Sequence, residues 1–421
     1  MRFVLTTWGS RGDVEPVAGL AVQLQELGAE VQLCAPPDDD FVALLERAGV
    51  ELVPMGPTVH SVVANPKPPT AEDAFRLAPE LVAARFKTIG AVAEGSDAVL
   101  ATGLMPAGAR DVADKLGIPY VLACFHTAGL PSRHVPPVGR PRRDSEPDAT
   151  DIQERWEQDS QRVNALYRDA VNSHRAAIGL PPVDSVRDYL LTDQPWLAAD
   201  PLLWPGKDKT DLDLVQTGAW ILPDNRPLSR ELEAFLDAGA PPVYVGFGSM
   251  AAHAPKDIAR IAIDVCRAQG QRMLLSRGWA ELGLTDDGDD YFVVGDVNQQ
   301  ALFPRVAAVI HHGGAGTTTT AARAGAPQVI VPQIVDQPQW AARVAELGIG
   351  VAHDGSTPTY DSLSAALKTV LAAETHATAK AVAGTIRTDG AKVAANLLIE
   401  AAQNARTPLR PPRRAPWSGR H

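Results

Sequence analysis

The chain has 421 residues, more than one ordinary hydrophobic core holds, so we expect at least two domains. Hydrophobic residues make up 45% and charged residues 21%, which is typical of a globular protein and excludes a disordered or fibrous one. The formal net charge of −11 argues against a general nucleic-acid binder, because binding to phosphates needs an excess of cations.

The first half of the sequence alternates short apolar runs with amphipathic helical patterns. A helix with Pro16 in its first turn is predicted to follow the loop at 9–12 and to stop at Gly28. The aspartates at 38–40 are predicted to open a second helix as capping and dipole residues, not as a metal site. Predicted strands lie at 3–7, 31–35, 98–101 and 120–123, with a further helix at 108–116.

The second half repeats this alternation. Both halves open with a strand that runs into Gly-Ser, at 9–10 and 248–249, which is a weak internal repeat. Strand and helix alternating at this spacing predict parallel pairing, and so two Rossmann-like, doubly wound α/β domains facing a cleft. The predicted strands lie at 243–247, 273–276, 292–294, 306–310 and 329–331.

Proline-rich chain at 201–209 and 223–227 separates the two halves. The expected boundaries are an N-terminal domain at 1–205, a linker at 206–227, a C-terminal domain at 228–403 and a disordered, basic, Pro-rich tail at 404–421. The last helix of the C-terminal domain is expected to pack back on the N-terminal domain.

Two long irregular segments interrupt the first domain, at 56–70 and 125–150. Both are rich in proline, and structureless loops of this length inside a domain are usually functional or disordered. They should leave the carboxyl edge of the sheet, where open α/β sheets bind ligands. We therefore expect a variable partner on the N-terminal domain and a standard ligand on the C-terminal domain.

The strongest motif is the sequence HHGGAGTT at 311–318, between a predicted strand and a predicted helix. Glycines at such a turn let backbone N–H groups approach an anion, and the helix N-terminus adds partial positive charge. Thr317 and His312 can add a hydroxyl and an imidazole donor, so the turn suits a diphosphate. The alternative is a tight turn whose glycines serve packing only. Neither a G-x-G-x-x-G fingerprint at either first turn nor a P-loop is present.

Two further candidates are carboxylates that follow predicted strands. Asp336 and Gln337 offer acceptors and donors suited to paired sugar hydroxyls, although Asp336 can equally be a helix cap. Asp13 should lie at the lip of the first domain, where it can act as a general base or, alternatively, as the cap of the helix that follows. His311 and His312 point to opposite faces of a strand, so we predict no metal site.

Taken in order, these motifs resemble the glycosyltransferases of the GT-B fold, and among them the enzymes that decorate glycopeptide antibiotics of the vancomycin and teicoplanin type. The likeness covers residues 1–403. The segments that carry it lie at 9–16, 197–201, 215–220, 245–249, 276–279, 311–317, 336–338, 351–355 and 357–359.

The resemblance implies inverting, metal-independent transfer of a sugar from a TDP- or UDP-sugar to an acceptor hydroxyl, with no cofactor. It implies that Asp13 is the general base, with Ser10 beside it. The donor is implied to lie against Arg11, Gly12, Ser249, Ser276, Trp279, Val297, His312, Gly314, Gly316, Thr317, Asp336 and Gln337. Plant relatives stack the base on a tryptophan where this chain has Asp296, so Trp279 is the substitute.

The implied acceptor is a glycopeptide aglycone, held by the two irregular segments. The stretch at 169–182 looks most like members that glycosylate the benzylic hydroxyl of the β-hydroxytyrosine at peptide position six. This likeness implies an amino sugar, either a deoxy sugar such as epivancosamine on TDP or N-acetylglucosamine on UDP. The alternatives are a hydrolysing nucleotide-sugar 2-epimerase and a non-catalytic protein that binds nucleotide sugars.

The sequence also bears on location. No run approaches the roughly 18 apolar residues of a membrane span, and Gly9 comes too early for a secretory signal. Cys34, Cys124 and Cys266 are odd in number and widely spaced, which fits buried thiols in a reducing compartment. We therefore expect a cytoplasmic protein without membrane or nucleic-acid partners.

Overall fold

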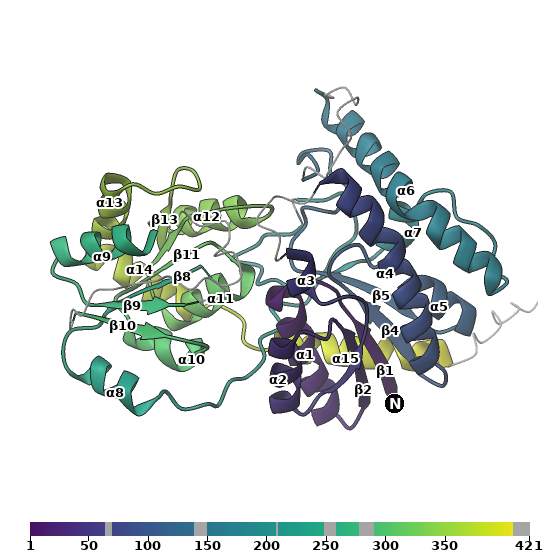
Figure 1. The fold of residues 1–421 in the computed structure, drawn as a ribbon, viewed down its shortest axis with the longest axis horizontal. Helices are drawn as coiled ribbons and strands as arrows, with labels where there is room; N and C mark the ends of the chain where they lie inside the picture. Colours follow the sequence, from purple (N-terminus) through teal and green to yellow (C-terminus); the bar gives the residue numbers. More distant parts are fainter. Residues whose placement is uncertain (64–69, 139–149, 208, 248–257, 278–289, 407–421) are drawn as a thin grey trace, which may run out of the picture.

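The computed structural model contains two α/β domains that lie side by side, each built on one parallel sheet (Figure 1). The structure describes residues 1–63, 70–138, 150–207, 209–247, 258–277 and 290–406. The strand order is β3-β2-β1-β4-β5-β6-β7 in the N-terminal sheet and β10-β9-β8-β11-β12-β13 in the C-terminal sheet. All the strand pairs that the structure describes are parallel, which confirms the predicted fold class.

The N-terminal domain follows the predicted alternation, with β3 added at one side of the sheet and β6 and β7 at the other. Its strands are β1 (Arg2–Thr6), β2 (Glu30–Ala35), β3 (Glu51–Pro54), β4 (Ala98–Ala101), β5 (Tyr120–Cys124), β6 (Trp196–Leu197) and β7 (Val215–Gln216). Its helices are α1 (Arg11–Glu26), α2 (Asp39–Ala48), α3 (Val59–Val63), α4 (Ala71–Val92), α5 (Ala109–Leu116), α6 (Ile152–Ala177) and α7 (Val186–Leu191). The sequence pattern missed β6 and β7 because two residues cannot show a period, and it missed β3 because its apolar run is only the two residues between Glu51 and Pro54.

The C-terminal domain has the same plan. Its strands are β8 (Val243–Gly246), β9 (Met273–Ser276), β10 (Tyr291–Val294), β11 (Ala308–His311), β12 (Gln328–Ile330) and β13 (Gly350–Ala352). Its helices are α8 (Arg230–Asp237), α9 (Ile258–Ala268), α10 (Gln299–Leu302), α11 (Ala315–Ala324), α12 (Gln337–Glu346), α13 (Tyr360–Val370), α14 (Ala373–Ala383) and α15 (Gly390–Arg406). β11 begins two residues later than predicted, because Phe303–Arg305 form a 3₁₀ turn that leads into it.

The central strands are buried along their whole length, as expected for parallel strands that helices cover on both faces. Their carboxyl ends point toward the gap between the domains. The loops that follow β1, β4 and β5 in one sheet, and β11 and β12 in the other, therefore come from the edges where ligands bind in folds of this kind.

The role expected for Asp38 is wrong. It stands at the N-cap of α2, but its side chain makes no capping hydrogen bond. Its carboxylate accepts instead from the backbone N–H groups of Val59 and His60, both at 2.8 Å, at the start of α3. Asp38 thus ties two helices together, a role that depends on a partner some twenty residues away along the chain.

Helix α15 crosses from the C-terminal domain and lies against α1 of the N-terminal domain (Figure 1). A row of small residues lets it approach closely, since a Cβ added at Gly390 would lie 2.4 Å from the carbonyl oxygen of Ala219. Ala394, Ala395 and Leu398 belong to the N-terminal core. Residues 404–406, expected to start the tail, form the last turn of α15, and the remainder of the tail lies outside the described residues.

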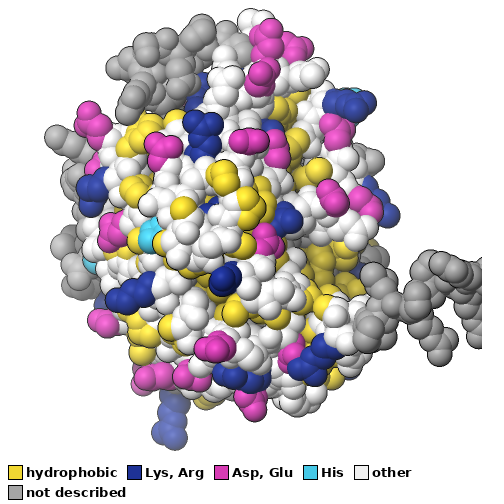
Figure 2. All heavy atoms as spheres, turned by 90° about the vertical axis from the view of Figure 1, so that its right-hand side faces the viewer, with side chains coloured by type: hydrophobic (Ala, Val, Ile, Leu, Met, Phe, Trp, Pro, Cys, Tyr) yellow, Lys and Arg dark blue, Asp and Glu magenta, His cyan; other side chains and the backbone are white. Residues whose placement is uncertain are grey.

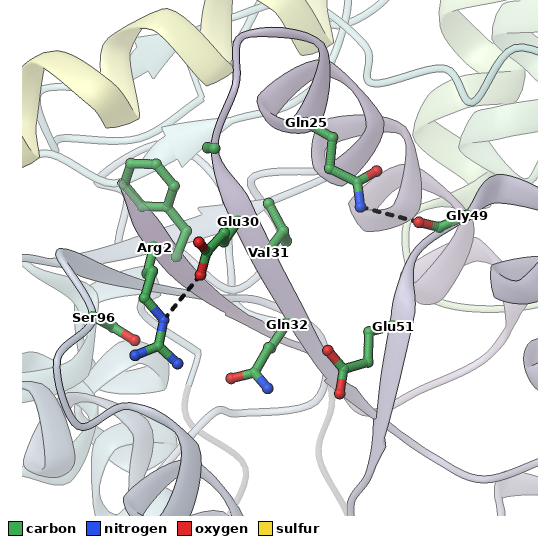
Figure 3. Close-up of a pocket in the computed structure, with 10 residues that line it drawn as sticks. Arg2, Gln25, Glu30, Val31, Gln32, Gly49, Glu51 and Ser96 are labelled. Atoms are coloured by element: carbon green, nitrogen blue, oxygen red, sulfur yellow. Dashed lines mark hydrogen bonds and ion pairs between the residues drawn. The ribbon is translucent and has the colours of Figure 1, made fainter.

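The surface carries cationic and anionic side chains interspersed over the face drawn in Figure 2. A polar depression lies at the amino ends of β1 and β2, the edge of the sheet opposite Asp13 (Figure 3). Arg2 and Glu30 form an ion pair there at 3.4 Å, and Gln25 donates to the carbonyl of Gly49 at 3.0 Å. Among the described residues, no helix is long and apolar enough to cross a membrane.

Candidate functional site

Asp13 lies in the first turn of α1, directly after β1. Ser10, not Asp13, holds the N-cap position, so the capping alternative for Asp13 does not apply. The Asp13 carboxylate accepts from the backbone N–H of Ser10 and from its hydroxyl, the latter at 3.3 Å. It also lies over Gly9, where an added Cβ would be 2.2 Å from Asp13 Oδ2. Glycine at position 9 therefore makes the room that this carboxylate occupies.

Burial raises the pKa of Asp13 from 3.8 to about 6, although the hydrogen bonds from Ser10 oppose the shift. Nearby His126, in the loop after β5, acts to lower the pKa, and Asp336 of the other domain acts to raise it. A carboxylate with a pKa close to neutral is a better proton acceptor than an ordinary aspartate, yet is still ionised at pH 7. The position therefore suits a general base.

We expect the acceptor kcat/KM to fall tenfold per pH unit below about pH 6, as Asp13 takes up a proton. The neighbouring His312 does not contribute a limb near pH 6, because burial lowers its pKa to about 4. A pH profile at subsaturating acceptor measures the effect. A limb centred near pH 4 would show that Asp13 titrates as an ordinary aspartate and would contradict the prediction.

The glycine turn joins β11 to α11 and is shaped from inside by His311. The fully buried His311 ring accepts from the N–H of Gly313 at 3.1 Å through Nδ1 and lies 2.9 Å from Gln328 Oε1 through Nε2. Burial and the neighbouring His312 lower the pKa of His311 to about 3, so the ring is neutral. Gly313 adopts a φ of +92°, in the left-handed region that favours glycine. His311, which the sequence did not single out, therefore fixes the turn.

The side chain of His312 points in a different direction from that of His311. Its Nδ1 is buried and has no hydrogen-bond partner among the residues that the structure describes, and its Nε2 lies over Gly314, where an added Cβ would be 2.7 Å away. The two rings are perpendicular, with centroids 6.4 Å apart, so they do not converge on one ion. A buried polar atom without a partner is a group that a ligand can satisfy.

The first turn of α11 supplies the remaining donors. The N–H groups of Ala315, Gly316 and Thr317 begin the helix and have no partner four residues back, whereas Thr318 N–H already bonds to the Gly314 carbonyl at 2.9 Å. Gly316 is exposed, and a Cβ added there would meet nothing within 4 Å. This is open space in front of a helix N-terminus, which suits an anion.

Asp336 and Gln337 begin α12, in the loop that follows β12. Asp336 takes the N-cap position without capping, and its Oδ2 accepts from the indole N–H of Trp340 at 2.7 Å. Among the described residues no donor bonds to its other oxygen, which is therefore left to accept from a ligand. The side-chain carbonyl oxygen of Gln337, Oε1, accepts from the backbone N–H groups of Gln333 at 2.7 Å and Ile334 at 3.1 Å. Only the amide NH₂ of Gln337 is therefore left for a sugar.

The two domains bring these groups together. Gly12 of the first domain and Gly316 of the second line one narrow cavity, which Trp340 also lines. Trp340 stacks near Trp204 with ring centroids 4.7 Å apart, and the backbone N–H of Arg387 donates to Asp200 at 2.8 Å. An apolar seam and fixed hydrogen bonds thus hold the Asp13 loop opposite the glycine turn.

The guanidinium of Arg11 is paired with two carboxylates. It donates to Glu15 at 2.6 Å and, across the domains, to Asp296 at 2.8 Å. Asp296 also accepts from Arg226 at 2.7 Å. Burial acts to raise the pKa of Asp296, but Arg226 and Arg11 outweigh it and hold the pKa below its usual range. Asp296, at the position where the resemblance would have led us to expect base stacking, is therefore an interdomain ion-pair centre.

Asp296→Asn is expected to lower the free energy of unfolding by about 0.2–1 kcal/mol at 0.1 M salt, and by less at 1 M, because partly exposed pairs are screened. Urea unfolding at the two salt concentrations measures this. Asp290→Asn is a matched control, since Asp290 pairs with Arg267 inside the C-terminal domain. A loss of several kcal/mol that salt does not change would contradict the prediction.

Of the nucleoside residues, Ser276 ends β9, where its side chain is hydrogen bonded to Tyr244. Val297 follows Asp296 and packs against the apolar cluster around Phe303. Ser249 and Trp279 lie outside the described residues, as do parts of the loops predicted at 56–70 and 125–150. No group of three His, Cys, Asp or Glu side chains suited to a metal ion occurs in the part of the chain that is described.

Sequence reasoning missed several residues that shape the site. Trp340 lies four residues after Asp336, one helical turn on, and this spacing is a signal that could have found it. The sequence places Gly9 and Gly313 in loops. It does not show that these two positions require glycine, because that requirement comes from the atoms that pack over them. His126 acts on Asp13 from the loop after β5, more than a hundred residues away along the chain, and no local pattern indicates this.

Two family models match the chain. Residues 3–123 match the glycosyltransferase family 28 N-terminal domain, and residues 288–394 match the C-terminal domain of erythromycin biosynthesis protein CIII-like proteins. Vancomycin aglycone glucosyltransferase of Amycolatopsis orientalis is 57% identical over 405 residues, which cover 95% of this chain and 98% of that protein. dTDP-epi-vancosaminyltransferase of the same organism is 52% identical over 392 residues, 91% of this chain and 93% of that one.

Solved structures agree in fold at low sequence identity. The glycosyltransferase of kitacinnamycin superposes with a TM-score of 0.71 at 20% identity, covering 95% of this chain and 98% of that chain. The glycosyltransferase VinC in complex with dTDP superposes with a TM-score of 0.65 at 19% identity, covering 96% and 100%. This likeness confirms the two-domain GT-B fold that the sequence predicts.

Proposed function

The chain belongs to the glycopeptide glycosyltransferase family, and from this premise we propose that it is an inverting, metal-independent enzyme that transfers a sugar from a TDP- or UDP-sugar to a hydroxyl of a glycopeptide aglycone. The observation that carries the proposal is a half-buried carboxylate with a raised pKa, Asp13, held opposite a helix N-terminus with open space before it. A base on one domain and an anion site on the other are the two parts that such a transfer needs.

In the proposed reaction the acceptor hydroxyl attacks the anomeric carbon as Asp13 removes its proton. The new carbon–oxygen bond forms while the bond to the diphosphate oxygen breaks, and the nucleoside diphosphate leaves with that electron pair. An alcohol is scarcely ionised at pH 7, so the base is worth about 10²–10⁴ in rate. A single displacement from the face opposite the leaving group inverts the anomeric configuration.

The leaving diphosphate gains negative charge, and the chain offers fixed donors for it. These are the N–H groups that begin α11, the hydroxyl of Thr317 and the neutral ring of His312, whose Nδ1 bonds to no group in the described part of the chain. Donors that are fixed before the reaction stabilise such charge without reorganisation. This supports a transfer that needs no metal ion, because backbone dipoles and an imidazole carry out the stabilisation.

For the acceptor we propose the benzylic hydroxyl of the β-hydroxytyrosine at position six. For the sugar, the sequence expectation is an amino sugar, and glucose is the second candidate. Glucose is considered because the chain is 57% identical to the relative named as an aglycone glucosyltransferase, which is more than the 52% identity to the relative named as an epi-vancosaminyltransferase.

The test is incubation of the full chain with TDP- and UDP-sugars, with and without a glycopeptide aglycone. Mass spectrometry of the product identifies the sugar, fragmentation identifies the modified residue, and the anomeric proton coupling reports inversion. Turnover in the presence of a chelator tests metal independence. Product that forms only with aglycone supports the proposal. An altered free sugar nucleotide would indicate an epimerase, and retained configuration or loss of turnover with chelator would overturn the mechanism.

A further inference from the structure

The carboxylate of Asp336 does not cap the helix that it begins. An N-cap aspartate usually accepts from backbone N–H groups of the first turn, but Asp336 makes no such bond. Its Oδ2 accepts instead from the indole N–H of Trp340, one helical turn on, at 2.7 Å. We propose that Trp340 is a positioning residue that aims Asp336 at the donor sugar and is itself held in place by Trp204 of the other domain. The inference rests on the proposed function and adds the residues that orient the sugar carboxylate.

The backbone ahead of Asp336 is fixed by its own loop. The side-chain oxygen of Gln337 accepts from the N–H groups of residues 333 and 334. Val335 has a φ of +53°, a strained conformation for a β-branched residue, which persists only where its surroundings impose it. What remains to be set is the rotation of the Asp336 side chain. Among the described residues, the donor that bonds to this carboxylate is the indole of Trp340.

Trp340 is buried in an apolar cluster that crosses the domain boundary. It is 1% exposed, and the cluster includes Leu203 and Trp204 of the N-terminal domain. The centroids of the Trp340 and Trp204 rings lie 4.7 Å apart, with 50° between the ring planes. Trp204 is itself buried, and its indole N–H donates at 3.2 Å to the hydroxyl of Thr127, in the loop after β5. The place of the Trp340 ring therefore depends on the N-terminal domain.

A second contact attaches α12 to the same turn of the N-terminal domain. Arg343 follows Trp340 by three residues, so the two side chains share one side of the helix. Its Nε donates to the carbonyl oxygen of Leu202 at 2.7 Å. Asp200 fixes that turn, since it accepts from the N–H groups of Leu202 and Arg387, both at 2.8 Å. Helix α12 lies on the side of its domain that faces the N-terminal domain (Figure 1), and these bonds hold it there.

Asp336 is placed among the other reacting groups. Its negative charge acts to raise the pKa of Asp13 in one domain and of His312 in its own. Trp340 fixes one carboxylate oxygen, and no donor among the described residues bonds to the other, which can accept from a sugar hydroxyl. A carboxylate whose rotation is already fixed loses little freedom when the sugar binds. The sugar is therefore held best in the domain arrangement that also places Asp13 opposite it.

Trp340→Phe keeps an aromatic ring against Trp204 and removes the indole N–H. We expect the affinity for TDP-glucose to fall about tenfold, while the affinity for TDP, which lacks the sugar, changes less than twofold. Calorimetric titration of the full chain measures both, with UDP-glucose and UDP titrated in parallel. Trp156→Phe is the matched control, because it removes a buried indole bond of 2.8 Å, to the carbonyl of Val135, inside the N-terminal domain. It should leave these affinities unchanged.

Two further variants test whether the effect passes along the proposed route. In an Asp336→Ala background, Trp340→Phe is expected to change the TDP-glucose affinity less than twofold, because the group that it orients is gone. Trp204→Leu is expected to lower the TDP-glucose affinity about three- to tenfold and to leave the TDP affinity unchanged, since it acts on Asp336 only through Trp340. Trp204→Phe, which keeps a ring against Trp340, should restore the sugar affinity.

Equal losses for TDP-glucose and TDP in Trp340→Phe would show a purely structural role and overturn the inference. It would also be overturned if Trp340→Phe kept its full effect without Asp336, if Asp336→Ala alone had no effect, or if Trp204→Leu matched the wild type. These titrations contain no aglycone. A wild-type chain that binds the sugar nucleotide but modifies no aglycone would therefore overturn the proposed function separately.

Discussion

Asp13→Asn is expected to lower kcat by about 10²–10⁴-fold while the affinity for the donor nucleotide changes little. Asparagine keeps the size of the side chain and one acceptor oxygen for Ser10, but it cannot take up the proton of the acceptor hydroxyl. Steady-state kinetics and calorimetric titration with TDP or UDP separate the two effects.

The same variant should gain stability. In the folded protein Asp13 binds a proton up to about pH 6, against 3.8 when unfolded, so its ionised form costs stability as the pH rises through that window. Removing the charge is expected to stabilise the protein by about 1–2 kcal/mol at pH 8. Asp39→Asn, at an exposed first-turn aspartate of α2, is the matched control and should leave turnover unchanged. Unaltered kcat in Asp13→Asn would remove Asp13 from its role as the base.

Gly313→Ala is expected to raise the donor KM at least tenfold and to lower the free energy of unfolding by roughly 2–5 kcal/mol. The φ of +92° is costly for alanine, and the new Cβ would lie 2.7 Å from Ile330 and 3.4 Å from Gln337. Because Gln337 ties the sugar-side loop, the displacement should spread from the diphosphate turn to Asp336. Donor kinetics and urea unfolding measure the two parts.

Gly117→Ala is the matched control for that change. Gly117 also has a positive φ, +67°, but an added Cβ would meet nothing within 4 Å, and it lies at the end of α5 away from the cleft. The control should lose about 1 kcal/mol of stability and keep its kinetics. If Gly313→Ala behaved like Gly117→Ala in both respects, the glycine turn would not be the diphosphate site.

The sequence predicted the central strands and the loops that follow them because long apolar runs bounded by glycine and proline are local signals. β8 and β11 were found in this way, and the helices that follow β1, β11 and β12, namely α1, α11 and α12, line one cavity between the domains. The short strands β6 and β7 were missed because two paired residues carry no period.

The roles that escaped prediction depend on partners far away in the chain. Asp38 looks like a cap, but it bonds to residues of α3. The motif of Gln337 predicts a sugar ligand, but it does not show that the side-chain oxygen of Gln337 already accepts two backbone N–H groups of the preceding loop. Arg85 carries no motif at all, since its three partners are backbone oxygens of a loop on another element.

The crossing of α15 has a consequence for how the chain matures as it is synthesised. The N-terminal domain cannot complete its core until residues 390–406 have left the ribosome, because that helix fills part of it. At a synthesis rate of about 5–20 residues per second, roughly 10–40 s pass between synthesis of the N-terminal half and synthesis of α15. During that interval the uncovered face of α1 is open to chaperones and to misassociation, so the two halves reach their native state together.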